Sequence, residues 1–337
     1  MASARPERVF RDTYGRVHDD LRISVTDRCN LRCAYCMPVE PHWFAHDEIL
    51  RYEEIHRLVR VAVRRGVRKL RLTGGEPLAR RDLLLLVRML AAEPGVEDLA
   101  LTTNGLLLGR MARRLAEAGV RRVNVSLDTL QPERFQAMTR KDLLARVLDG
   151  IAAAVAAGLQ PVKVNTVLMR GVNENETEAL ARHARDHGWE LRFIEFMPVE
   201  NGGGWDPSQV VPGEETRRRI HRLWPIERDV RGDVRSPATR YLYRDGKGAV
   251  GFIDSVTRPF CESCARLRLT ADGKFRVCLY DDREVDLKRP LREGASDAEL
   301  ERLMVEAVAG KGPGGALEIL EKQGALPLAR TMHQIGG

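Results

Sequence analysis

Short apolar, β-branched runs alternate with longer amphipathic stretches between residues 20 and 198. The runs alternate apolar and polar positions as strands do, and the longer stretches repeat apolar residues at helical spacing. Six strands are predicted, at Leu21–Asp27, Lys69–Thr73, Leu99–Asn104, Arg122–Asp128, Pro161–Leu168 and Glu190–Pro198. Helices are predicted between them, near Tyr52–Arg65, Arg81–Ala91, Arg110–Ala118, Leu143–Ala157 and Glu174–His187. This order is typical of βα units, and six units leave a barrel open where eight would close it.

The alternation stops at the glycine-rich stretch Asn201–Gly204. After it, a helix is predicted near Glu214–Leu223 and a last helix near Ala316–Lys322, with short strands and Asp-Gly turns between them. These strands are expected at Arg240–Arg244, Ala249–Asp254, Ala265–Thr270 and Phe275–Leu279. The sequence therefore predicts an α/β fold. Residues 1–200 would form a partial (β/α)6 barrel of the TIM type, and residues 201–337 a smaller α+β domain that covers the barrel opening.

One side of the predicted barrel strands is polar. Alternate residues of a strand face opposite sides, and Arg22, Arg71 and Lys163 each alternate with aliphatic neighbours. A closed barrel fills its interior with branched apolar side chains. The alternation therefore predicts a wet, cationic cavity that suits phosphate and ribose oxygens, with a solvated sheet edge as the alternative.

Composition and charge narrow the class of protein. The 337 residues are 43% hydrophobic and 31% charged, which is typical of a folded globular chain. The net charge of +7 is compatible with a small anionic substrate but is too weak and dispersed to indicate nucleic-acid binding. The longest apolar runs, Leu83–Val87 and Ile151–Ala157, are too short to span a bilayer, and the N-terminus has no signal-peptide pattern. We expect a cytoplasmic protein without membrane association.

The cysteines form two groups of three. The first cysteine group is Cys29, Cys33 and Cys36, and the second cysteine group is Cys261, Cys264 and Cys278. Disulfides would need an oxidising compartment, and structural zinc usually takes four protein ligands, although zinc remains open for the second group. Three thiolates suit a [4Fe–4S] cluster that leaves one iron free to bind a small molecule.

The first cysteine group has the spacing C-x3-C-x2-C after the first strand, and here the chain resembles the radical SAM superfamily. The resemblance implies that S-adenosylmethionine (SAM) binds the free iron and is cleaved to a 5′-deoxyadenosyl radical. The turn Thr73-Gly74-Gly75-Glu76-Pro77 after the second strand lies where that superfamily contacts SAM. By resemblance, the SAM contacts are Tyr35, Gly75, Glu76, Ser126 and Met197.

Over nearly its whole length the chain resembles the GTP 3′,8-cyclase family of molybdenum cofactor biosynthesis. The segments that carry this resemblance are Leu21–Cys36, Thr73–Leu78, Cys261–Thr270, Cys278 and Gly336-Gly337. It implies that the second cysteine group holds a second [4Fe–4S] cluster, whose free iron binds the guanine of GTP. The implied GTP contacts are Arg22, Arg71, Thr102, Lys163, Arg266, Leu267 and Arg268. Arg192 is a further candidate although its strand parity is opposite to that of Met197, and Gly336 and Gly337 are expected to enter the pocket.

The family's reaction would then be expected of this chain. The radical would abstract the ribose 3′ hydrogen of GTP, and the product would be (8S)-3′,8-cyclo-7,8-dihydroguanosine 5′-triphosphate. No residue is assigned as an acid or a base. The resemblance also implies a homodimer and transfer of the product to the cyclic pyranopterin monophosphate synthase, whereas the electron donor is unknown.

Two other functions remain open at this point. A radical SAM peptide-modifying enzyme with an auxiliary cluster would share the first cysteine group, but such enzymes commonly have more than three cysteines in the C-terminal region. An electron carrier or a zinc-stabilised module would explain the cysteines, but would require neither the Gly75-Glu76 turn nor a cationic cavity.

Overall fold

The computed structural model describes residues 9–199, 205–317 and 329–336. Within these ranges, twelve strands form one sheet in the order β12-β11-β10-β1-β2-β3-β4-β5-β6-β9-β8-β7. The first six are β1 (Asp20–Ser24), β2 (Lys69–Thr73), β3 (Asp98–Thr103), β4 (Arg122–Ser126), β5 (Lys163–Leu168) and β6 (Glu190–Glu195). The others are β7 (Ile226–Arg228), β8 (Thr239–Tyr243), β9 (Ala249–Ile253), β10 (Arg266–Leu269), β11 (Lys274–Arg276) and β12 (Val285–Asp286).

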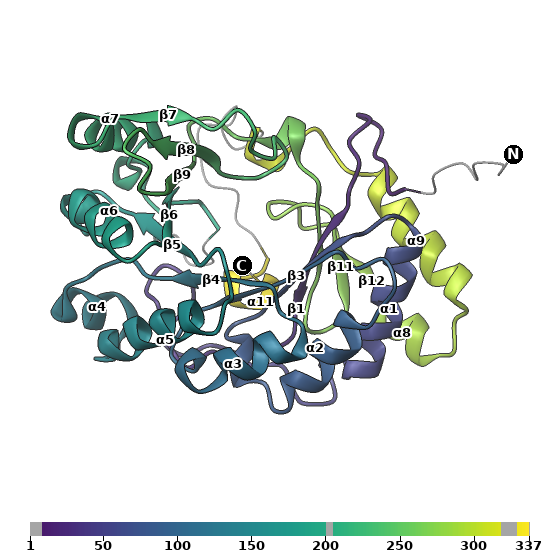
Figure 1. Cartoon of the computed structure of the whole chain (residues 1–337). Coiled ribbons are helices and arrows are strands. Elements are labelled where there is room, and N and C mark those ends of the chain that lie inside the picture. Colours follow the sequence, from purple (N-terminus) through teal and green to yellow (C-terminus); the bar gives the residue numbers. More distant parts are fainter. Residues whose placement is uncertain (1–8, 200–204, 318–328, 337) are drawn as a thin grey trace, which may run out of the picture.

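Most helices lie around the outside of the sheet, and the short α11 lies in the interior near the C-terminus (Figure 1). The first six are α1 (Tyr52–Arg64), α2 (Leu83–Ala91), α3 (Leu108–Ala118), α4 (Pro132–Thr139), α5 (Leu144–Ala156) and α6 (Thr177–Asp186). The others are α7 (Gly213–Leu223), α8 (Lys288–Arg292), α9 (Asp297–Ala309) and α11 (Met332–Ile335). In the described parts of the chain, no helix is long and apolar enough to cross a membrane.

The six predicted barrel strands are all present, in the predicted order, and β1 to β6 pair in parallel. The strand predictions ran too far at the C-terminal ends: β1 ends at Ser24 and β6 at Glu195, because the chain turns there into loops. Four of the described helices were not predicted, namely α4, α8, α9 and α11. One of them, α9, has a recognisable start, since the Ser296 hydroxyl accepts a hydrogen bond from the backbone N–H of Glu299.

The strands after residue 205 extend both edges of the six-stranded sheet. β10 pairs in parallel with β1, and β9 pairs in parallel with β6. Antiparallel strands follow at each end, so the sheet does not close. The C-terminal part therefore extends the partial barrel across its opening, and the division into two domains at residue 200 stays a prediction. The helix predicted near Ala316–Lys322 lies mostly outside the described residues.

The apolar core lies between the sheet and the outer helices. Ile23, Leu72, Leu101 and Val125 come from neighbouring strands, and each is fully buried. Since successive strand residues face opposite sides, the polar residues beside them point to the interior of the curved sheet. Burial of the aliphatic face thus fixes the direction of the cationic face.

Glu195, the last residue of β6, connects the first half of the chain to the second. Its buried carboxylate accepts hydrogen bonds from the backbone N–H groups of Gly213, Val256 and Thr257, each at 2.8 Å. The hydroxyl of Thr257 donates a fourth, at 2.5 Å. One carboxylate therefore fixes the start of α7 and the loop after β9 to the end of β6.

Glu195→Gln should destabilise the fold, because the new amide nitrogen would face backbone donors and cannot accept from them. We expect the free energy of unfolding to fall by about 2–3 kcal/mol, measured by denaturant titration. Glu133→Gln, at an exposed position on α4, is the matched control and should be neutral. Equal stability of the two variants would contradict the role given to Glu195.

Candidate active site

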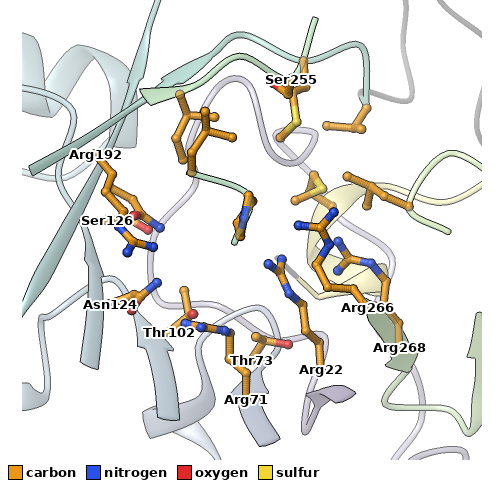
Figure 2. A pocket seen from close by; sticks show the side chains of 18 of the residues that line it. Arg22, Arg71, Thr73, Thr102, Asn124, Ser126, Arg192, Ser255, Arg266 and Arg268 are labelled. Carbon is orange, nitrogen blue, oxygen red and sulfur yellow. The ribbon is translucent and has the colours of Figure 1, made fainter. Parts of the chain in front are cut away.

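A cavity of about 450 Å³ lies inside the curved sheet, and we call it the central cavity. Both cysteine groups line it. Figure 2 shows arginine side chains from several strands pointing into it. The structure therefore brings together two groups that are more than 220 residues apart in the sequence.

Strand register places the predicted cations side by side. Arg22 on β1 is the partner of Arg71 on β2 and of Arg268 on β10. Neighbouring strands are about 4.8 Å apart, so these three guanidinium groups form one row across the sheet. Lys163 on β5 is the register partner of Asn124 on β4, which also lines the cavity.

Arg22, Arg71 and Lys163 form no ion pair with a carboxylate in the part of the chain that the structure describes. The Nε of Arg22 and two guanidinium nitrogens of Arg71 are buried without a hydrogen-bond partner among the described residues. Burial and the charge of Arg268 lower the pKa of Arg22 to about 9, and burial and Arg22 lower the pKa of Arg71 to about 9. Burial and Arg192 lower the pKa of Lys163 to about 7. The cavity is therefore electrostatically incomplete without an anion.

Arg192 also lines the central cavity, but its charge is compensated. Its guanidinium donates to the Glu190 carboxylate at 2.6 and 2.8 Å. The parity argument against it fails because β6 ends at Glu195, so alternation does not extend to Met197. Met197 reaches the cavity from the following loop.

The first cysteine group lies in the loop after β1. The Sγ of Cys29 accepts from the backbone N–H of Leu31 at 3.4 Å and from the Asn104 side chain at 3.7 Å. Burial raises the pKa of Cys29, and it raises the pKa of Cys36 to about 12. Thiols in such surroundings become thiolates when a metal binds them.

The turn after β2 lies directly against this loop. The backbone N–H of Gly75 donates to the Thr26 carbonyl at 2.7 Å, and that of Glu76 donates to the Arg28 carbonyl at 2.8 Å. A Cβ atom on Gly75 would lie 2.4 Å from the Asp27 oxygen and 2.5 Å from the Arg28 oxygen. Only glycine therefore allows the turn and the cysteine loop to approach so closely.

Glu76 is buried below the turn and does not itself line the cavity. Its carboxylate accepts from the backbone N–H groups of Leu78 and Asn104 and from the Thr103 hydroxyl, at 2.8 to 3.0 Å. Burial raises its pKa to about 7, although these hydrogen bonds favour the charged form. In this structure Glu76 ties the turn after β2 to the end of β3.

Tyr35, Ser126 and Met197 all line the central cavity. The Tyr35 hydroxyl donates to the Asp128 carboxylate at 2.6 Å. Burial raises the pKa of Asp128 to about 6, and the hydrogen bond from Tyr35 opposes this shift. Asp128 thereby fixes Tyr35 within the cysteine loop, a role that sequence reasoning did not assign to it.

The second cysteine group lies beside the arginines of β10. Burial opposes ionisation of Cys264, but Arg266 and Lys311 lower its pKa to about 6. A Cβ atom on Gly314 would lie 2.5 Å from the Cys261 Sγ, so this glycine makes room for the cysteine. In the described ranges, no three His, Cys, Asp or Glu side chains converge on one metal ion. A [4Fe–4S] cluster needs no such point, because each thiolate binds a different iron.

The C-terminal residues reach the same cavity. The carbonyl oxygen of Gly336 accepts a hydrogen bond from Arg268 at 2.5 Å. A Cβ atom on Gly336 would lie 2.7 Å from the Thr73 hydroxyl, and its φ of +88° favours glycine. Gly337 lies outside the described residues.

Other predicted contacts divide into two kinds. Thr102, Arg266 and Arg268 line the cavity. Leu267 is fully buried in the apolar core on the opposite side of β10 and does not line the cavity. Sequence reasoning missed Arg122 and Tyr280, which also line the cavity. Arg122 lies on the same face of β4 as Ser126, so the alternation of the strand could have predicted it. Tyr280 lies in a loop, where no such alternation exists. Which ligand each residue contacts stays a prediction.

Gly75→Ala should weaken the first cysteine site, because the added methyl group would overlap the backbone next to Cys29. We expect a lower iron content after anaerobic reconstitution and a loss of stability of about 1–3 kcal/mol. Gly109→Ala on α3 is the control, since a Cβ there meets nothing within 4 Å. Normal iron loading of Gly75→Ala would show that the close approach is not required.

Comparisons with known proteins agree with this arrangement. Residues 23–184 match a family model described as the radical SAM superfamily, and residues 189–316 match one described as Molybdenum Cofactor Synthesis C. A protein named GTP 3′,8-cyclase from Pelotomaculum thermopropionicum is 51% identical over 304 residues, 90% of this chain and 94% of its own length. One of the same name from Moorella thermoacetica is 47% identical over 329 residues, 97% of this chain and 100% of its own.

Among solved structures, Streptococcus suis SuiB bound to S-adenosylmethionine has a TM-score of 0.62 and covers 86% of this chain and 69% of its own. At 14% sequence identity this likeness concerns the fold alone. The identity to the curated relatives extends over nearly the whole chain and includes both matched regions. The chain therefore belongs to the GTP 3′,8-cyclase family of the radical SAM superfamily.

Proposed function

We propose that this chain is a cytoplasmic radical SAM enzyme that converts GTP to 3′,8-cyclo-7,8-dihydro-GTP in molybdenum cofactor biosynthesis. The observation that carries the proposal is the central cavity itself. It is lined by both groups of three cysteines and by cations that form no ion pair with any described carboxylate. The high identity to curated relatives of that name supports the same reaction.

The first cysteine group would hold a [4Fe–4S] cluster next to SAM. When bound, the cluster and SAM supply the carbon radical that removes hydrogen from the substrate. The chain's own part would be to place SAM, and the proposed contacts Gly75, Ser126 and Met197 all line the central cavity. Glu76 and Asp128 keep the two loops in position through the hydrogen bonds described above.

The cationic row would bind the triphosphate. Arg22, Arg71 and Arg268 present guanidinium groups from adjacent strands, and paired N–H donors match phosphate oxygens. Arg266, on the same strand as Arg268, and Lys163, on β5, also line the cavity and add positive charge to it. An anionic ligand would relieve the mutual repulsion of these groups. The same contacts that bind the triphosphate would therefore also orient it.

The second cysteine group would hold a second [4Fe–4S] cluster that contacts the guanine. Cys264 lies next to Arg266, so base and phosphates would be held from neighbouring positions on the chain. The C-terminal Gly336 carbonyl, bound to Arg268, narrows the cavity and helps to exclude water. We further propose a homodimer that passes its product to the cyclic pyranopterin monophosphate synthase.

The peptide-modifying alternative gains no support from these findings. The curated relatives with 51% and 47% identity have the name GTP 3′,8-cyclase, and both cover more than 90% of their own length. The cationic row is suited to a polyanion and gives no reason to expect a peptide. We therefore retain GTP as the substrate.

The two cysteine groups should fail separately. Cys264→Ser should leave SAM cleavage to 5′-deoxyadenosine measurable and abolish GTP cyclisation, whereas Cys33→Ser should abolish both. Both products are measured by chromatography after anaerobic reconstitution and reduction with SAM and GTP. Equal loss of both products in Cys264→Ser would contradict a substrate-binding second cluster, and 5′-deoxyadenosine formed without consumption of GTP would contradict the proposed reaction.

GTP affinity should fall as the pH rises above 7. The pKa of Lys163 is about 7 in the empty cavity, so binding above this pH must take up a proton to recover the charged amine. We expect up to tenfold weaker binding per pH unit between about pH 7.5 and 8.5, measured by calorimetry.

Lys163→Met should bind more weakly and lose this part of the pH dependence, while Lys247→Met, at an exposed position, should keep it. An unchanged slope in Lys163→Met would assign the pH dependence to another group.

A further inference from the structure

A buried network of charged residues lies behind the second cysteine group, outside the central cavity. Its members are Asp12, Arg16, His18 and Lys311, and none of them lines the central cavity. Asp12 and Lys311 are 5% and 3% exposed, and His18 is fully buried. Charged side chains are rarely buried to this degree unless partners compensate their charge. The hydrogen bonds of these residues therefore indicate their role.

Lys311 directs its amine at Cys264. The Nζ donates to the Cys264 Sγ at 3.5 Å, to the Arg266 carbonyl at 3.2 Å and to the His18 Nδ1 at 3.5 Å. An ammonium group has three N–H donors and no acceptor, so all its donors are used. The sulfur is the one of these three acceptors that can carry a negative charge.

His18 fixes the orientation of Lys311. Its Nε2 donates to the Asp12 carboxylate at 2.9 Å, which leaves Nδ1 as the acceptor for the amine. Burial and Lys311 lower the pKa of His18 to about 4, so the ring is neutral and in this tautomer. His18 thereby holds Lys311, the hydrogen-bond donor to the proposed metal ligand Cys264, in place. Residues outside the ligand set commonly orient metal sites in this way.

Arg16 anchors the same network to the chain around the cysteines. Its Nε donates to Asp12 at 2.6 Å. Its other nitrogens donate to the carbonyl oxygens of Cys261 at 2.9 Å, of Pro313 at 2.6 Å and of Gly312 at 2.6 Å. Arg16 therefore ties the segment that carries Lys311 to the start of the second cysteine group.

We infer that Lys311 is a positioning residue for the second cysteine group, which donates a hydrogen bond to the Cys264 thiolate and raises the reduction potential of the cluster bound there. Asp12, Arg16 and His18 hold it in place. This inference rests on the proposed second [4Fe–4S] cluster. A donor and a positive charge at a ligand sulfur stabilise the reduced, more negative cluster, because hydrogen bonds to the sulfurs and net charge set its potential.

The test compares the reduction potential of the second cluster between variants of the full chain. The background is Cys29→Ser/Cys33→Ser/Cys36→Ser, so that the measured signal comes from the second cysteine group. In Lys311→Met the ratio of reduced to oxidised cluster at a fixed ambient potential should fall about tenfold, which corresponds to a downward shift of about 59 mV for one electron. Lys247→Met removes an exposed lysine and should leave the potential unchanged. The potential is read by electron paramagnetic resonance during a redox titration.

A second pair of variants separates orientation from folding. His18→Leu removes both hydrogen bonds of the ring and should shift the potential downward by less than Lys311→Met does. His18→Gln can still accept from Lys311 and donate to Asp12, so it should return the potential close to that of the background chain.

Three results would overturn the inference. The first is an equal reduction potential in Lys311→Met and Lys247→Met. The second applies if Lys311→Met binds no iron, and it is an equal reduction potential in His18→Leu and His18→Gln. If the background chain itself binds no iron at the second cysteine group, the proposed second cluster fails as well, which distinguishes that failure from the other two.

Discussion

Mutual repulsion of cations inside one cavity is the constraint on which this structure depends. Arg22, Arg71 and Arg268 occupy register partners on three adjacent strands, and buried nitrogens of Arg22 and Arg71 have no partner among the described residues. Such a row would be unfavourable in a protein without an anionic ligand, because each group loses hydration without gaining an opposite charge. The sheet must therefore be stable enough to hold charges with which no described carboxylate forms an ion pair.

Buried carboxylates supply part of that stability, and they bind backbone groups instead of the cationic row. Glu76 and Glu195 lie after β2 and at the end of β6, and each accepts several backbone N–H groups from loops. They thereby fix the loops that border the cavity without neutralising the arginines. Arg192 shows the contrast, since Glu190 pairs with it directly. Because these carboxylates bind loops and not the arginine row, positive charge remains where an anion would bind, and the loops are held where the cofactors would bind.

Residues that look unrelated in the sequence cooperate at the second cysteine group. Asp12, Arg16 and His18 precede β1, and Lys311 follows α9, yet they form one buried network beside Cys264. No period or motif links these positions, because their contacts are made by loops whose course depends on the completed sheet. The N-terminal segment thus contributes to a site that its own sequence does not indicate.

The sequence alone determined the six βα units, the two cysteine groups and the polar face that carries Arg22, Arg71 and Lys163. These features follow from local periods and spacings, which are properties of a strand or a loop by itself. The tertiary structure alone decided that β10 pairs with β1 and β9 with β6, and that both cysteine groups therefore line one cavity. Strand pairing between distant segments depends on which edges remain open after the sheet forms, and no local pattern encodes it.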